Sequence, residues 1–303
     1  MDQIEQHYIT QFHSAWEHLT QQMSQLFAGV VSRDTVNGKE KSYNQIAKTT
    51  MRLVTTRSGQ TIPQERDLTK RWVRPRAYDA VDWFDEFDDI LLGTIVKPTS
   101  EVIQSHVAAY KRTLDALVLN AAVGTAYTGE SGTTGTVLPT TQKVAVNYIK
   151  PGGTPANVGL TLDKLIKAKS ILGKNHVYED QNAEGLVISV KQAHLDDLLF
   201  NVSQVSSKDY NAVQALVNGE VKNFMGFRFI RSEENPWVDE ANDVSAAVVW
   251  HPSAIKLVEG TRKTHMDVLP QQNHTLQIRT VGWMGATRMM EEKVVQIACD
   301  ESP

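Results

Sequence analysis

The sequence predicts an α+β protein in which one long helix lies across a sheet. Three observations favour this class: a helical apolar stripe over residues 100–123, several short β-branched segments towards the carboxyl end, and a polar hairpin pattern at 49–75. The chain has 303 residues, of which 41% are apolar and 22% charged, as is usual for globular proteins. It is long enough for two ordinary cores or one large core.

Residues 1–28 are predicted to form an amphipathic helix that ends near Gly29. Its apolar positions recur at spacings of four and three, so they share one face. We expect this stripe to pack either on another copy of the chain or against the chain's own core. The stripe contains Ile4, Tyr8, Phe12, Trp16, Leu19, Met23 and Leu26, and the packing is expected at Tyr8, Phe12, Trp16 and Leu19.

A long hairpin is predicted next. Residues 32–48 are polar and rich in turn signals, and two extended arms follow at 49–57 and 67–75. Both faces of the arms are polar, so the hairpin has little core of its own. From Lys48 to Arg76 there are eight basic residues and only two acidic ones.

An acidic segment and the strongest helix follow. Residues 77–91 contain six acids and no base; their spacing favours a short helix, although a strand also fits. Ser100 is a good N-cap for the helix over residues 100–123, which has one strongly apolar stripe. One stripe predicts a helix that lies on a sheet rather than inside a bundle.

The remaining chain alternates between helix and strand patterns. Residues 124–136 are predicted as a Gly-rich loop and 142–149 as a strand. A helix over 161–172 is expected to point Leu162, Leu165, Ile166 and Ile171 inward. Further expected elements are strands at 185–190, 221–231 and 245–251, helices at 192–199 and 252–260, and closing strands within 282–299.

The residue pattern predicts no catalytic, cofactor or metal site. Gly129, Gly132 and Gly135 lack the Gly-Lys-Ser/Thr ending of a phosphate loop. The acids at 79–89 could bind a divalent cation, but the apolar residues between them favour a solvated face. His194 has no companion nucleophile motif, and Cys299 is best interpreted as a packed thiol.

Charge and hydropathy exclude other functions. The net charge of −4 argues against a protein that coats nucleic acid as a whole. The first residues, MDQIEQHY, lack a basic region followed by an apolar run, so no signal peptide is expected. No apolar run approaches the ~20 residues needed to span a bilayer, so we expect no membrane association.

The segment from Arg74 to Gly132 joins these features in a specific order: an acidic-aromatic stretch, Pro-Thr-Ser, a long helix and a Gly/Thr loop. With the closing GWMGATRMMEEKVVQIACDE, it resembles the major capsid protein of tailed bacteriophages, over most of residues 45–300. The resemblance implies the capsid fold shared with encapsulins. Its parts would be an N-terminal arm (1–35), an extended loop (36–76), a peripheral domain (77–155 and 272–303) with the spine helix 100–123, and an axial domain (156–271).

The resemblance implies a structural subunit that forms pentamers and hexamers in an icosahedral shell around double-stranded DNA. The implied partners are further copies of the chain, a separate scaffolding protein, a portal protein, a decoration protein and DNA bound without sequence specificity. The implied location is the virion, after assembly in the host bacterial cytoplasm. An encapsulin-type cargo shell protein is the alternative, and an enzyme is not expected.

Opposite charges on adjoining segments predict a contact between subunits, because the hairpin projects away from the segment that follows it. In the fold that the chain resembles, this loop lies over the peripheral domain of the next subunit. Alternatively, the bases face packaged DNA, or they form a solvated face. The expected contacts are Arg52, Arg57, Arg66 and Arg71 of the loop with Asp82, Asp85, Glu86 and Asp89 of the acidic segment.

Overall fold

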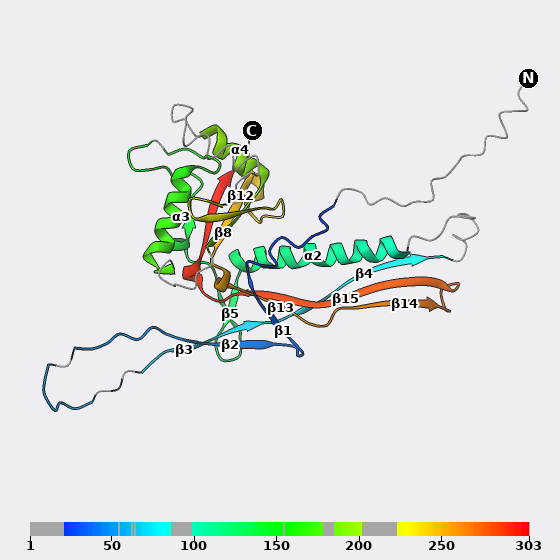
Figure 1. The fold of residues 1–303 in the computed structure, drawn as a ribbon, viewed down its shortest axis with the longest axis horizontal. Coiled ribbons are helices and arrows are strands. Elements are labelled where there is room, and N and C mark those ends of the chain that lie inside the picture. Colours follow the sequence, from blue (N-terminus) through cyan, green and yellow to red (C-terminus); the bar gives the residue numbers. More distant parts are fainter. Residues whose placement is uncertain are drawn as a thin grey trace, which may run out of the picture. The chain divides into compact units, whose positions relative to one another are not determined.

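A computed structural model describes residues 21–85, 99–177, 185–201 and 223–302, except positions 54, 62, 64 and 154. The chain divides into two compact units (Figure 1). The first comprises Met1–Gln25, Ala77–Thr113 and Thr261–Trp283, and the second comprises Leu26–Arg76, Leu114–Gly260 and Met284–Pro303. Helix α2 (Thr99–Val123) and strand β15 (Thr275–Arg288) contribute residues to both units.

The largest sheet belongs to the second unit. Its strand order is β7 (Lys143–Val144), β16 (Val294–Asp300), β12 (Val244–Trp250), β8 (Leu186–Val190), β10 (Phe227–Arg231) and β9 (Asn223–Phe224), with β11 (Trp237–Asp239) also on β12. Every residue of β8 and β12 is buried, which explains why all residues of these strands except Ser189 and Ser245 are apolar. The strand expected at 142–149 is limited to β7.

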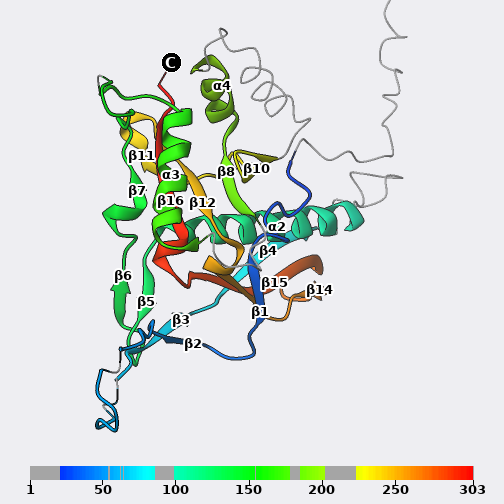
Figure 2. The same ribbon diagram turned by 60° about the vertical axis from the view of Figure 1, so that its left-hand side comes forward.

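Helix α3 (Leu162–Lys174) packs on this sheet beside β16 (Figure 2). Thr161 caps its first turn, since the Thr161 side chain accepts a hydrogen bond from the Lys164 backbone. Leu165 and Leu172 are fully buried in the core, whereas Ile166 is 54% exposed, so its expected inward position is wrong. Helix α4 (Gln192–Asn201) forms where the sequence predicts it.

The strand predicted at 221–231 is a tight hairpin rather than one strand. Strands β9 and β10 pair antiparallel across Met225 and Gly226, and both of these residues have positive φ values. Glycine tolerates this conformation without the steric cost of a side chain. Phe227 and Phe229 then point into the core while Arg228 is exposed, as the alternation predicts.

A second sheet contains the segment predicted as a helix at 252–260. That prediction is wrong: a 3₁₀ turn at Pro252–Ala254 leads directly into strand β13 (Ile255–Glu259). β13 pairs in parallel with β1 (Ser32–Thr35) and antiparallel with residues 284–288 of β15. Pairing on both sides fixes the extended form, so tertiary contacts override the local helical spacing.

A third sheet carries the predicted hairpin. Its strand order is β2 (Lys41–Ile46), β3 (Leu68–Val73), β5 (Ala126–Thr128) and β6 (Thr134–Thr136). The hairpin is confirmed, but its first strand is β2 and not residues 49–57, and the Gly-rich loop is itself a short hairpin. Residues 47–67 form the loop between β2 and β3, and every described residue in it is exposed. We call residues 47–67 the projecting loop.

In the first unit, strand β4 (Arg76–Phe84) replaces the short helix favoured by the sequence. It joins β15, which pairs antiparallel with β14 (Lys263–Leu269). His106 of α2 contacts the Asp82 carboxylate at 2.8 Å and the Thr280 hydroxyl at 3.3 Å. These contacts place the helix on the sheet, as predicted.

The end of the predicted N-terminal helix is wrong, since residues 21–28 are not helical. In the second unit, the Asp115 carboxylate accepts hydrogen bonds from the backbone N–H groups of Leu26 (2.8 Å) and Phe27 (3.2 Å). The buried Phe27 ring packs edge-on against Trp250. The rest of the predicted helix, with Tyr8, Phe12, Trp16 and Leu19, lies outside the described residues.

Candidate functional site

Two buried arginines share one carboxylate at the base of the projecting loop. The Nη2 atom of Arg71 on β3 donates to both carboxylate oxygens of Glu291, at 2.7 and 2.5 Å. The Nε atom of Arg288, at the end of β15, lies 3.6 Å from the same carboxylate. Arg71 is 6% exposed and Arg288 is fully buried. The group therefore carries a net positive charge where water is largely excluded.

Arg288 also ties three chain segments together. Its Nη1 donates to the backbone carbonyls of Ala122 (2.9 Å) and Gly124 (2.7 Å), and its Nη2 to that of Thr136 (3.1 Å). Burial lowers the pKa of the Arg288 guanidinium, while the Glu291 carboxylate raises it and the Arg71 cation lowers it. The end of α2 is thereby fixed to the β5–β6 hairpin.

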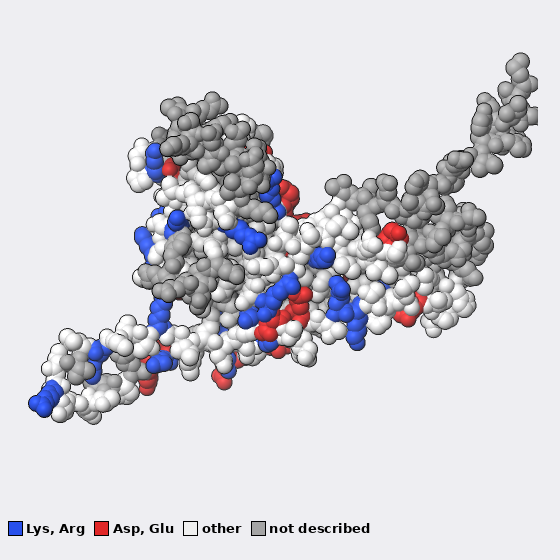
Figure 3. Space-filling model, viewed as in Figure 1, with Lys and Arg blue, Asp and Glu red and all other residues white. Residues whose placement is uncertain are grey.

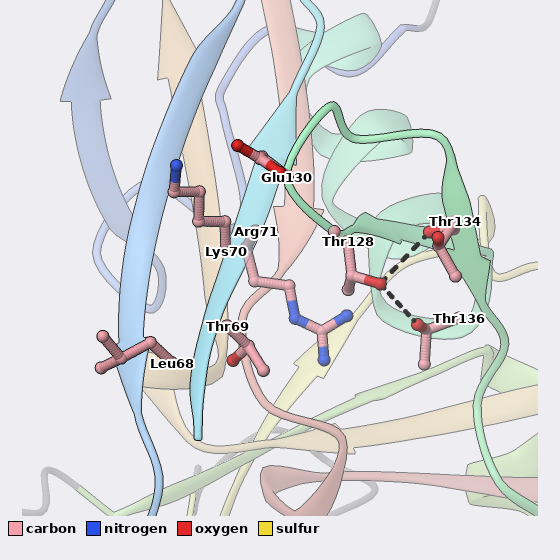
Figure 4. Close-up of a pocket in the computed structure, with 9 residues that line it drawn as sticks. Leu68, Thr69, Lys70, Arg71, Thr128, Glu130, Thr134 and Thr136 are labelled. Carbon is pink, nitrogen blue, oxygen red and sulfur yellow. Dashed lines mark hydrogen bonds between the residues drawn. The ribbon is translucent and has the colours of Figure 1, made fainter. Parts of the chain in front are cut away.

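A cleft of about 660 Å³ opens between β3 and the β5–β6 hairpin (Figure 4). The Arg71 guanidinium lies among the side chains of Thr69, Thr128 and Thr136 in this cleft. Among the described residues, the Nε and Nη1 atoms of Arg71 have no hydrogen-bond partner, and neither has the Nε atom of Arg288. The other lining residues are Leu68, Lys70, Gly129, Glu130 and Thr134.

The β5–β6 hairpin is held against β3 by Trp72. Its indole Nε1 donates to the Gly129 carbonyl at 2.7 Å. Gly132 packs face-on against the same ring: a Cβ atom there would lie 2.6 Å from the ring carbon Cγ. This close approach requires glycine at position 132. It gives a packing reason for one glycine of the segment that was predicted to be a surface loop.

The predicted loop arginines divide into two groups. Arg52, Arg57 and Arg66 are exposed on the projecting loop, whose far end carries Lys and Arg side chains (Figure 3). None of these three forms an ion pair among the described residues. Arg71, which was expected at the surface, is instead buried against Glu291 of its own chain. That expectation of exposure is wrong because the Arg71 guanidinium is turned towards the Glu291 carboxylate within the second unit, where Arg71 is only 6% exposed.

One of the predicted acids has a partner within the first unit, since the Asp82 carboxylate contacts His106. Asp79, an acid of the same segment that was not among the predicted contacts, pairs with Arg279 at 2.9 Å. Asp85 is half-buried at the end of β4. Glu86 and Asp89 lie outside the described residues.

A serine, a histidine and a carboxylate meet inside the second unit, but their hydrogen bonds do not suit catalysis. The backbone N–H of Lys191 donates to His194 Nδ1 at 3.2 Å, so the ring proton is on Nε2. Nε2 then donates to Ser245, whose hydroxyl donates to Glu301. The imidazole cannot accept the serine proton, and burial lowers its pKa to about 4. Both Ser245 and His194 are fully buried, so this is a structural link to the chain end.

Cys299 and Lys164 are also buried without a reactive setting. Burial raises the pKa of the Cys299 thiol to about 12, which confirms the prediction of a packed thiol. The ammonium of Lys164 donates to the carbonyls of Val158, Gly159 and Ala298 at 2.5, 2.9 and 2.8 Å. Burial lowers the pKa of this ammonium. Lys164 therefore connects β16, through the Ala298 carbonyl, to the segment that precedes α3.

The described residues contain no group of histidine, cysteine or acidic side chains arranged to hold a metal ion. Within the same residues, no helix is both long and apolar enough to cross a membrane.

Arg288 and Glu291, which complete the charged group around Arg71, were not among the site residues predicted from the sequence. Arg288 and Glu291 are three residues apart, a spacing that allows an ion pair. The one local sign that Arg288 is buried is its position at the end of the apolar pattern of β15. Their approach to Arg71, more than two hundred residues away, depends on the fold.

Comparison with known proteins gives consistent matches. A family model described as phage capsid protein matches residues 4–301. None of the curated proteins is significantly similar in sequence. Among solved structures, the capsid of cyanophage P-SCSP1u aligns over 99% of this chain and 95% of its own, with a TM-score of 0.72 and 14% identity.

Two further structures show the same fold. A chain from Mycobacterium phage Che8 aligns over 96% of this chain and 97% of its own, with a TM-score of 0.67 and 16% identity. The capsid of cyanophage Pam1 aligns over 98% and 97%, with a TM-score of 0.72 and 10% identity. The α+β fold predicted from the sequence is therefore confirmed as the fold of these structures.

Proposed function

Because the chain belongs to the phage capsid protein family, we propose that its copies assemble as pentamers and hexamers into an icosahedral shell around double-stranded DNA. The chain is a structural capsid subunit, and the encapsulin alternative is not favoured by the family match. The proposal gives the chain no catalytic role. Further proposed partners are a scaffolding protein, a portal protein and a decoration protein, with assembly in the host cytoplasm.

The exposure of the projecting loop is the structural observation that best supports this proposal. None of its described residues is buried, although it contains Met51 and Leu53, and the strand ends beside it carry the exposed Ile46 and Leu68. Exposed apolar side chains on a loop without a core of its own are usual at protein interfaces. The loop therefore has the composition of a segment that a neighbouring subunit covers.

We retain the four-part division as a proposal: arm 1–35, extended loop 36–76, peripheral domain 77–155 with 272–303, and axial domain 156–271. We also retain the packing of the arm through Tyr8, Phe12, Trp16 and Leu19 on a neighbouring subunit. Burial of each such side chain contributes about 1.5–3 kcal/mol, which accumulates in a repeated contact.

Expression of the chain, alone and with the phage's scaffolding protein, tests the proposed function. We expect particles of megadalton mass, which sedimentation would detect and electron microscopy would show as closed shells. Subunits that remain monomeric under both conditions would contradict the proposal. Shells that enclose a protein cargo, without any capacity for DNA, would restore the encapsulin alternative.

The basic residues of the loop are proposed to dock on the acidic segment of a neighbouring subunit. The loop contacts are Arg52, Arg57 and Arg66, since the Arg71 guanidinium is committed to Glu291 in its own chain. The acidic side includes Asp82, Asp85, Glu86 and Asp89. Asp82 contacts His106 but remains half-exposed, so it can accept a second partner. Exposed ion pairs contribute only about 0.2–1 kcal/mol each, so they orient the subunits more than they stabilise the shell.

Reversal of charge at Arg57→Glu and Arg66→Glu is expected to slow assembly about tenfold at low salt, because electrostatic steering of the loop is lost. The difference should shrink at high salt, where charges are screened. Light scattering would follow the assembly rate. The further changes Asp85→Lys and Glu86→Lys in the same chain should restore part of the assembly rate, because the reversed charges attract each other again.

The control is Lys150→Glu with Lys174→Glu, two exposed lysines outside the loop. If the loop variant assembles at the normal rate and loses only its retention of DNA, the arginines face the genome and the docking proposal is wrong.

A further inference from the structure

The connection between β1 and β2 contains an Asn-Gly pair, Asn37 and Gly38, at the base of the hairpin that carries the projecting loop. Both residues are exposed. Asn-Gly is a usual turn sequence, but asparagine is also a chemically labile residue. Its side-chain amide lies within reach of the main-chain nitrogen that follows it, and glycine has no side chain to shield that nitrogen. The other Asn-Gly pair of the sequence, Asn218-Gly219, lies outside the described residues.

The structure leaves the two reacting groups of this pair unrestrained. Among the described residues, neither the Asn37 side chain nor the Gly38 N–H group forms a hydrogen bond. Apart from its chain neighbours, the nearest atom to a Cβ built on Gly38 would be the Glu40 carbonyl oxygen, at 3.9 Å. The Asn37 side chain can therefore turn towards the Gly38 nitrogen without breaking a contact.

Other asparagines of the described residues are held in place. The Nδ2 atom of Asn175 donates to the Glu292 carbonyl at 3.0 Å, and that of Asn242 donates to the Asp239 carboxylate at 2.6 Å. Asn120 lies within helix α2, where the N–H group that follows an asparagine is bonded to the preceding turn. These contacts keep the side-chain amide and the main-chain nitrogen apart, so the structure singles out Asn37.

We propose that Asn37 is a site of spontaneous deamidation, which converts it to aspartate and isoaspartate. The Gly38 main-chain nitrogen loses its proton to water and attacks the side-chain carbonyl carbon of Asn37. A C–N bond forms, the side-chain amide takes up a proton and leaves as ammonia, and a cyclic succinimide remains. Water then opens the ring: cleavage at the former side-chain carbonyl gives aspartate, and cleavage at the main-chain carbonyl gives isoaspartate. The inference does not depend on the proposed function.

Either product places a new negative charge between two ion pairs. The Lys41 ammonium lies 2.8 Å from the Asp34 carboxylate, and the Nε atom of Arg74 lies 3.3 Å from the Glu40 carboxylate. The added carboxylate is near both cations and therefore competes with their present partners. Exposed ion pairs contribute little to stability, so the charge of the hairpin base changes more than the stability of the fold.

Isoaspartate also lengthens the main chain, because the chain then passes through the former side-chain carbon. The connection is fixed at both ends: the Val36 N–H donates to the Glu259 carbonyl at 3.1 Å, and Lys41 begins β2. The extra length is confined to the exposed residues 37–40. We therefore expect the converted chain to keep its melting temperature within about 2 °C.

Incubation of the purified chain at mildly alkaline pH, followed by trypsin and mass spectrometry, tests the proposal. Cleavage after Arg33 and Lys39 releases residues 34–39, in which Asn37 is the single asparagine. We expect this peptide to convert, with more isoaspartate than aspartate, while the peptides that contain Asn175 and Asn242 stay unchanged. Conversion should be slower at mildly acidic pH, because the attacking nitrogen must lose its proton.

A synthetic peptide of residues 32–41 supplies the rate that the local sequence gives without the fold. Since nothing in the described structure holds Asn37, the folded chain should convert within about threefold of this rate. An unchanged Asn37 in the folded chain, while the synthetic peptide converts, would overturn the proposal. Equal conversion of Asn37, Asn175 and Asn242 would also overturn it.

Gly38→Ala is the matched control. Gly38 is not among the residues with positive φ, and the space around it admits a Cβ atom, so this variant should fold as the wild type does. We expect its conversion to be about tenfold slower, because a side chain on residue 38 shields the nitrogen and restricts the backbone. Equal rates for the wild type and Gly38→Ala would overturn the succinimide route.

Discussion

Replacement of residues 48–66 by Asn-Gly is expected to abolish shell formation while leaving the subunit folded. The described residues of the projecting loop bury nothing, so their removal should change the free energy of unfolding by less than about 0.5 kcal/mol. The backbone N–H of Ala47 already bonds to the Asp67 carbonyl at 3.1 Å, so the two ends are adjacent. Asn-Gly is the favoured two-residue connection between antiparallel strands.

Urea unfolding and sedimentation of the shortened chain would measure the two effects separately. Two full-length variants would show whether apolar contacts or charges of the loop are needed for shell formation. The first, Met51→Ser with Leu53→Ser, removes apolar contacts. The second changes Arg52, Arg57 and Arg66 to Gln and removes positive charge. Shells formed in normal yield by the shortened chain would show that the loop is not an interface. An unfolded product would show that the loop supports its own subunit.

The second large effect is expected on stability, from Lys164→Met. The buried ammonium is held by three backbone carbonyls, and methionine of similar length leaves their oxygens facing one another without this donor. Hydrogen bonds from a charged donor contribute about 1.5–3 kcal/mol each, offset here by the cost of burying the charge. We expect a net loss of about 2–4 kcal/mol.

Chemical unfolding of the unassembled subunit would measure this loss. The control is Lys169→Met on the same helix, because Lys169 is exposed and donates to the Met225 carbonyl from the surface. Its expected effect is below about 0.5 kcal/mol. An unchanged midpoint for Lys164→Met would mean that desolvation of the ammonium cancels its three hydrogen bonds.

The elements that sequence analysis predicted correctly are those with a long local pattern. Helix α2 follows from one apolar stripe that spans residues 100–123, and β8 and β12 follow from short segments that are apolar except for one serine each. The segments at 252–260 and 77–84 carried short helical spacings and became strands, because β13 and β4 each found partners distant in sequence. An apolar spacing that would support only about two helical turns stabilises a helix too little to compete with strand pairing.

The candidate site was predictable only in part, for the same reason. The positive charge of residues 48–76 is visible in the sequence, and the exposure of Arg52, Arg57 and Arg66 agrees with it. The sequence could not separate Arg71 from them, since its burial accompanies an ion pair with Glu291, 220 residues further along the chain. Residues that look equivalent along a chain acquire different roles when the fold gives one of them a distant partner.

The burial of Cys299 has a practical consequence for following this protein in time. It is the single cysteine of the chain, it is fully buried, and its thiol resists ionisation. A thiol reagent can reach it only when β16 opens, so its labelling rate reports the opening of the central sheet. A cysteine introduced at an exposed position of the loop would react at once. The labelling rate of Cys299 would therefore report unfolding, and the labelling rate of the loop cysteine would report how far a neighbouring subunit covers the loop.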